Sequence, residues 1–235
     1  MDALGEARRL GFLGPGPLER QLAQGQAFAR VLADRLPPDR GPLLDLGAGG
    51  GLPGLVMAVA GVAGHLILVD ASLRRTDFLE RAVRNLGLEE RATVVRGRAE
   101  ELGRLSHYRE AFAAVVSRGF GPPAVTAECA SPFLAPGGIL LVSEPPPESS
   151  DRGRSVPSEE GKGAGGGGEG QRARGGPDPE EDRRWPAAAL ERLGLTPERR
   201  ISCQGFSFQV LTKSAPCPQG FPRRSGVPRK RPLFP

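Results

Sequence analysis

The chain has 235 residues, which is enough for one α/β domain with a sizeable core and some appended segments. Its net charge is +5, but residues 213–235 hold six basic residues and no acid, so the rest of the chain sums to −1. The three cysteines, Cys129, Cys203 and Cys217, have neither metal-ligand spacing nor the pattern of a disulfide framework. With no visible signal peptide, transmembrane run or lipidation motif, we expect a cytoplasmic monomer that needs neither membrane nor metal.

The first 40 residues are expected to form a helical extension. Apolar residues recur at helical spacing between Gln21 and Leu36, and Pro37-Pro38 ends the pattern. The run Gly14-Pro15-Gly16-Pro17 separates this helix from whatever precedes it.

A strand followed by a glycine turn and a helix is the most informative stretch of the chain. The apolar strand 43–46 runs into glycines at 47, 49 and 51, and residues 55–62 follow as a buried helix. Such turns bring backbone N–H groups and a helix N-terminus close to a ligand. Asp45 stands two positions before Gly47, and no G-K-[S/T] follows. The D-x-G-x-G-x-G pattern resembles motif I of class I methyltransferases, which bind S-adenosylmethionine; a structural glycine turn in another α/β protein is the alternative.

The next strand, residues 65–70, ends on a carboxylate about 20 residues beyond the glycines. Asp70 is therefore placed to accept hydrogen bonds from the two hydroxyls of a ribose, although an acid that merely caps a helix fits the same position. Residues 72–86 form an amphipathic helix in this prediction, with Gly87 as its C-cap, and residues 92–97 form the third strand.

The remaining pattern completes a parallel sheet. Residues 111–117 and 139–142 are predicted strands, with a helix over 124–134 and a turn at 136–138 between them. Arg118, at the tip of the fourth strand, would face a methionine carboxylate or an RNA phosphate, or would only solvate the strand end. A short helix at 185–193 and an antiparallel pair, 200–203 with 206–212, are expected to close the sheet. Alternating strands and helices predict an α/β, doubly wound, mostly parallel sheet with a terminal antiparallel hairpin.

Residues 145–183 interrupt this order. They are rich in glycine, proline and mixed charge and contain almost nothing apolar, so we expect a disordered insertion. The predicted organisation is a helical extension over 1–40, a catalytic domain over 41–144 and 184–213, the insertion, and a basic C-terminal tail over 214–235.

Four local motifs resemble the RsmG (GidB) family of bacterial 16S ribosomal RNA guanine-N7 methyltransferases. They are the loop 47–54 with Leu52-Pro53-Gly54, the run Asp70-Ala71-Ser72 with Arg74-Arg75 and Phe78-Leu79, the pair of short motifs at 98–101 and 117–120, and the ending Phe221-Pro222-Arg223-Arg224 through Leu233. The resemblance covers residues 20–144 and 185–235. Three features depart from it: a short N-terminus without the family's Asn-Leu-Thr segment, Ser143-Glu144 in place of a lysine, and the insertion.

The resemblance implies a class I methyltransferase fold, S-adenosylmethionine as cofactor and small-subunit ribosomal RNA as partner. The implied cofactor-binding residues lie in the glycine turn and at three strand ends: Gly47, Gly49, Leu52, Asp70, Ala99, Glu100 and Arg118. The basic tail is expected to contact RNA phosphates through Arg223, Arg224, Arg229, Lys230 and Arg231, unless it is only a solubilising terminus.

The residues suit methylation of guanine N7, whose lone pair carries no proton and needs no general base. No D/N-P-P-Y tetrad follows the fourth strand, and no cysteine is placed as a nucleophile, so no catalytic side chain is assigned. Two other interpretations stay open at this point: a small-molecule methyltransferase, and a non-catalytic protein that binds S-adenosylmethionine and RNA.

Overall fold

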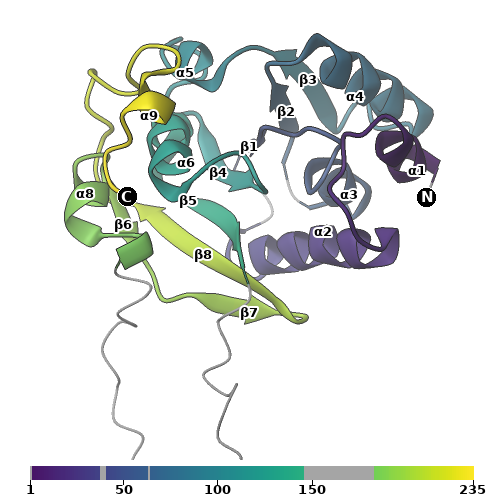
Figure 1. The fold of residues 1–235 in the computed structure, drawn as a ribbon, viewed down its shortest axis with the longest axis horizontal. Coiled ribbons are helices and arrows are strands. Elements are labelled where there is room, and N and C mark those ends of the chain that lie inside the picture. The colour runs from purple at the N-terminus through teal and green to yellow at the C-terminus, as the bar shows by residue number, and fades with distance from the viewer. Residues whose placement is uncertain (1, 38–40, 63, 146–182) are drawn as a thin grey trace, which may run out of the picture.

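The computed structural model describes residues 2–37, 41–62, 64–145 and 183–235, and these form one central sheet with helices on both faces (Figure 1). The order of the strands is β3-β2-β1-β4-β5-β8-β6, and β7 pairs with β8 outside that path. The order reverses direction between β1 and β4, which is where ligands bind in doubly wound sheets. The predicted fold class is confirmed.

Five strands pair in parallel, and three more extend the sheet through antiparallel pairs, all of which include β8. The parallel strands are β1 (Leu43–Leu46), β2 (Leu66–Asp70), β3 (Ala92–Arg96), β4 (Phe112–Ser117) and β5 (Leu134–Glu144). The others are β6 (Leu195–Pro197), β7 (Ile201–Cys203) and β8 (Phe206–Lys213), with both β6 and β7 paired to β8. The expected β7–β8 pair is confirmed, and β6 is an additional strand that the sequence did not indicate.

The helices divide between the two faces of the sheet. One face carries α1 (Asp2–Arg9), α2 (Leu18–Ala33), α3 (Gly54–Val59) and α4 (Leu73–Asn85). The other carries α5 (Ala99–Leu102), α6 (Pro123–Ala130), a 3₁₀ turn (Ser131–Phe133) and α8 (Ala187–Glu191), while α9 (Val227–Lys230) lies on α6.

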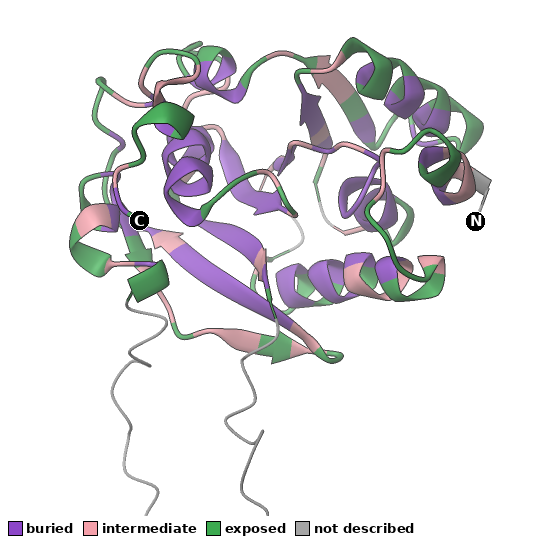
Figure 2. Ribbon diagram, in the orientation of Figure 1, coloured by how far each residue is buried: buried purple, intermediate pink, exposed green. Residues whose placement is uncertain are grey.

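Each strand supplies both faces because its side chains alternate. Leu43 and Val116 pack on the α2–α3–α4 side, whereas Leu44 and Val115 pack on the α6 side. Central strands buried on both faces explain their almost continuous apolar sequence, and Figure 2 shows them buried between partly exposed helices.

Helix ends follow their sequence signals only in part, since α2 and α3 end at Ala33 and Val59, short of the expected Leu36 and Val62. Gly87 has φ +63° and the Leu88 amide donates to the Val83 carbonyl at 3.0 Å, as expected of a glycine C-cap. The helix expected over 124–134 ends instead at Ala130, because Pro132 has no amide proton and a 3₁₀ turn replaces the last turn. The predicted turn at 136–138 falls inside β5, beside a register shift opposite Phe112 and Ala114.

The last residues pack against the domain. Cys217, Pro222 and Phe234 are buried, and Phe234 joins the apolar core on the α6 face. The predicted disordered insertion lies almost wholly in residues 146–182, outside the described residues. Among the helices of the described ranges, none is long and apolar enough to cross a membrane.

Candidate active site

The glycine turn after β1 has the geometry that its sequence requires. Gly47, Gly49 and Gly51 have φ values of +75°, +55° and +87°, a region where side chains are strained. A Cβ atom on Gly47 would lie 2.7 Å from Cδ2 of Phe120, in the loop after β4. The turn therefore requires glycine at position 47, where the backbone packs directly against Phe120 at the switch point of the sheet.

Asp45, near the end of β1, lies fully buried beneath this turn. Its Oδ2 atom accepts a hydrogen bond from the Gly54 amide at 2.9 Å, and its Oδ1 atom has no partner among the described residues. Burial raises the pKa of Asp45 to about 7, and the nearby Asp70 adds to this, while Gly54 and Arg118 oppose it. A buried carboxylate oxygen without a partner is costly, and a nearby cationic group would offset that cost.

Asp70, at the end of β2, accepts hydrogen bonds from the glycine turn and from the start of the loop that follows β2. Oδ2 accepts from the Gly49 amide at 3.0 Å, and Oδ1 accepts from the Ser72 amide at 2.8 Å. Arg75 lies 3.5 Å from Oδ2. Carboxylate oxygens can accept further bonds, so both remain able to receive ribose hydroxyls.

A cavity of about 280 Å³ opens over the carboxyl ends of β1, β2 and β3. Four of the predicted cofactor residues line it together: Gly47, Asp70, Ala99 and Glu100. Arg229, from the opposite end of the chain, also forms part of its wall. The sequence predicts an RNA phosphate contact for Arg229 and does not predict this placement.

A second cavity, of about 190 Å³, lies on the β5–β8 side. Arg118 lines it and donates from Nη2 to Oε1 of Gln21, on α2, at 3.2 Å. Arg20 and Phe206 also line it, with the guanidinium of Arg20 5.7 Å from the Phe206 ring centroid. Glu144 closes its floor and binds Arg184 and the Trp185 indole, so the carboxylate in place of the family lysine is paired.

Two of the predicted cofactor residues line neither cavity. Gly49 contributes its amide to Asp70, and the Leu52 side chain packs into a small apolar cluster with Leu4 and Val56. Cys129 does line the first cavity, but burial, with Glu100 and Glu128 nearby, raises the pKa of its thiol well above the usual range. The thiol is therefore protonated and unsuited to nucleophilic attack.

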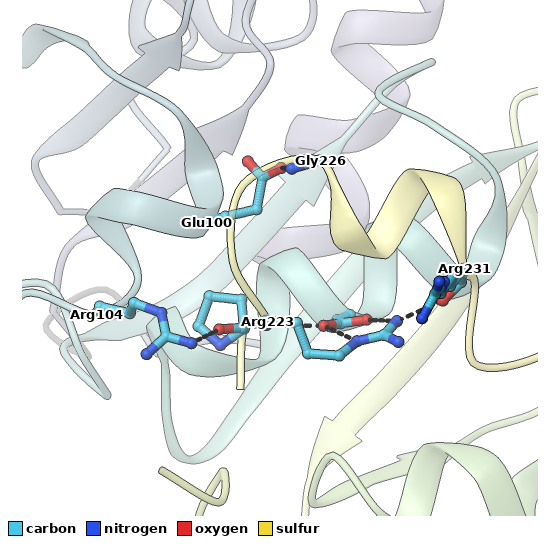
Figure 3. Close-up of polar contacts among 7 residues, drawn as sticks. Glu100, Arg104, Arg223, Gly226 and Arg231 are labelled. Atoms are coloured by element: carbon cyan, nitrogen blue, oxygen red, sulfur yellow. Dashed lines mark hydrogen bonds and ion pairs between the residues drawn. The ribbon is translucent and has the colours of Figure 1, made fainter. Parts of the chain in front are cut away.

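The basic residues near the C-terminus do not act as one set. Nε and Nη2 of Arg223 donate to the two carboxylate oxygens of Glu128 at 2.8 and 2.6 Å, and Nη2 also reaches the Arg231 carbonyl (Figure 3). The Arg223 guanidinium therefore binds groups of the protein itself, whereas the sequence predicts that it contacts an RNA phosphate. Arg224, Lys230 and Arg231 are exposed, and within the described residues their side chains have no ion-pair partner.

Comparisons with known proteins identify close relatives. The model of the family GidB, described as rRNA small subunit methyltransferase G, matches residues 26–144. The chain is 32% identical over 208 residues to "Ribosomal RNA small subunit methyltransferase G" of Moorella thermoacetica, covering 86% of this chain and 73% of that one. It is 30% identical to the protein of the same name from Pelotomaculum thermopropionicum, covering 81% and 69%. A solved "SAM dependent methyltransferase" from Aquifex aeolicus matches with TM-score 0.55 and 16% identity, over 89% of this chain and 97% of that one.

Proposed function

The chain belongs to the rRNA small subunit methyltransferase G family, and from that premise we propose that it transfers a methyl group from S-adenosylmethionine to a guanine of small-subunit ribosomal RNA. The observation that carries the proposal is the convergence of Gly47, Asp70, Ala99 and Glu100 on one cavity at the switch point of the sheet.

The residues present fit the cofactor. Asp70 would hold the ribose, and Ala99 and Glu100 would border the adenine. Arg118, on the other side of β1, would bind the methionine carboxylate, and the unpaired Oδ1 of Asp45 would face the methionine ammonium. Two observations support these assignments. Oδ1 of Asp45 is buried without a described partner, and the glycine turn leaves no room for a side chain at Gly47.

For this reaction the protein needs only to position the two reactants. The cofactor supplies a methyl group on a positively charged sulfur. Guanine N7 presents a lone pair with no proton to remove, so the side chains need only align the base and exclude water. The cavity beside Arg118 is the place for that base, because it lies at the end of β4 and is walled by Phe206, an aromatic surface for stacking.

Arg224, Lys230 and Arg231 would supply phosphate contacts to the RNA. All three are exposed, and they follow one another along a segment that borders the cofactor cavity. Arg20, exposed at the second cavity, would extend this basic surface to the base itself.

The test is mass mapping of 16S ribosomal RNA in purified small subunits before and after incubation with enzyme and S-adenosylmethionine. We expect one guanine to gain one methyl group, with an N7-specific cleavage signature after borohydride and aniline. Arg118→Met should lower the yield sharply, while exposed Arg84→Met should not change it. Methyl transfer only to small molecules, or cofactor binding with no transfer to RNA, would contradict the proposal.

A further inference from the structure

The last residues of the chain, which we call the C-terminal segment (217–235), are anchored to the domain by a buried charge. Glu128, on α6, is 0% exposed. Besides the two bonds from the Arg223 guanidinium, its Oε1 accepts the Arg223 backbone amide at 2.9 Å. A carboxylate without solvent is costly unless it is paired and fully hydrogen-bonded, so this contact fixes where the segment docks.

Two arginines of the domain bind the backbone of residues 217–222, which precede Arg223. Arg109 donates to the carbonyls of Cys217, Pro218 and Phe221, and Arg104 donates to the Pro222 carbonyl. Because prolines cannot donate and the segment forms no strand, these side-chain donors replace the missing backbone partners.

A third contact joins the segment to the cofactor cavity. The Gly226 amide donates to Oε1 of Glu100 at 2.9 Å (Figure 3). Arg98 donates to the same oxygen at 3.0 Å. Burial alone would raise the pKa of Glu100, but these hydrogen bonds outweigh it and leave the pKa below its usual range. The carboxylate that borders the cavity is therefore also the docking point of the segment.

After Gly226 the chain runs along the cavity, and Arg229 lines it. Helix α9 begins at Val227 and places Arg229 among the lining residues, on the side that also holds Glu100 and Cys129. Within the described residues, the Arg229 guanidinium has no ion-pair or hydrogen-bond partner. The cavity is lined by three arginines. Arg75 pairs with Asp70 and Arg98 pairs with Glu100, so Arg229 is the one whose guanidinium has no partner among the described residues.

We propose that the C-terminal segment is a wall of the cofactor site, in which Arg229 covers the adenine end and Arg223, through Glu128, is a positioning residue. The inference rests on the proposed function, because it concerns the same cavity. A planar guanidinium stacks on the face of a purine through a cation–π contact, which an aliphatic side chain cannot make. The adenine end lies away from the sulfur, so the effect should be the same for S-adenosylhomocysteine, which lacks the transferable methyl group.

The experiment is calorimetric titration of the full chain with S-adenosylhomocysteine, with circular dichroism to show that each variant is folded. Arg229→Met should weaken binding about five- to thirtyfold, the loss of one stacked guanidinium. Arg192→Met, an exposed arginine just after α8 that lines no part of either cavity, should bind within twofold of the unaltered chain.

Hydrogen exchange supplies a second readout that a purely structural role would not move. S-adenosylhomocysteine should slow amide exchange over residues 224–230 in the unaltered chain, because ligand and segment stabilise each other reciprocally. Arg223→Met should speed exchange there and weaken ligand binding, while Arg229→Met should remove the ligand-dependent slowing.

The outcomes separate the inference from the proposed function. If the unaltered chain binds neither S-adenosylmethionine nor S-adenosylhomocysteine, the proposed function fails first. If it binds them and folded Arg229→Met binds equally well, or if ligand leaves exchange over 224–230 unchanged, only the role of the C-terminal segment is overturned.

Discussion

Asp45 accepts the Gly54 amide at 2.9 Å, and this bond ties the end of β1 to the first residue of α3 beneath the glycine turn. The bond satisfies only one of the two carboxylate oxygens, and the other stays buried without a described partner. The strand–turn–helix is thus held by a residue whose second carboxylate oxygen is a buried acceptor without a described partner.

The first prediction concerns pH. The pKa of Asp45 rises from its ordinary value of 3.8 to about 7 in the folded chain, so the folded state binds more protons than the unfolded state between these values. Stability should therefore fall as pH rises from about 4 to about 7, by at most about 4 kcal/mol from this group. Asp45→Asn does not titrate, and its thermal midpoint should change less between pH 5 and pH 8.

A thermal series at pH 5, 6, 7 and 8 measures this, with Asp77→Asn, an exposed acid on α4, as the matched control. The expected pattern is a steeper decline for the unaltered chain and for Asp77→Asn than for Asp45→Asn. Parallel curves for all three would mean that Asp45 does not titrate in this range.

The second prediction compares two glycines with similar backbones. Gly47 and Gly87 have φ values of +75° and +63°, so alanine is strained at both by about 1–2 kcal/mol. Only at Gly47 would the new Cβ meet a side chain, Phe120 at 2.7 Å; at Gly87 nothing lies within 4 Å. Gly47→Ala should therefore unfold at lower denaturant and lose cofactor binding, while Gly87→Ala should keep its binding. Equal losses in the two variants would show that Phe120 moves aside without cost.

The third prediction concerns Asp70. Asp70→Asn keeps one oxygen for the Gly49 or Ser72 amide but removes the charge and one acceptor. Affinity for S-adenosylmethionine, measured by calorimetry, should fall by about 1–3 kcal/mol, the value of hydrogen bonds to a charged group. Exposed Asp77→Asn again serves as control. An affinity unaffected by Asp70→Asn would mean that the ribose is held by other groups.

The sequence predicted those parts of the fold and the site that depend on local pattern. The strand ends near Asp45 and at Asp70 and Ser117, the glycine turn and the alternation of strands with helices all follow from residues close together in the chain. Their convergence on one edge is a property of any doubly wound sheet, so the sheet itself brings Gly47 and Asp70 together.

What the sequence could not predict depends on contacts between distant residues. Arg223 and its partner Glu128 are 95 positions apart, and Gly226 and Glu100 are 126 apart. Glu128 has no local signature, since a carboxylate on a helix predicts a solvated face unless its buried partner is known. Strand β6 was missed for the same kind of reason: three residues carry too little pattern, and pairing with β8 forms it.

The last prediction separates the RNA contacts of the basic segment from its structural role. Changing Arg224, Lys230 and Arg231 to Ala should flatten the salt dependence of RNA binding by about two to three units, at roughly 0.7–0.9 per phosphate contact. Arg223 is left intact because its pairing with Glu128 positions the segment. The control changes three exposed arginines elsewhere, Arg84, Arg192 and Arg199, to Ala, which removes the same charge. Filter binding to a 16S ribosomal RNA fragment across 50–300 mM salt measures both slopes. Equal slopes for the two triple variants would show that net charge, and no specific contact of the C-terminal segment, attracts the RNA.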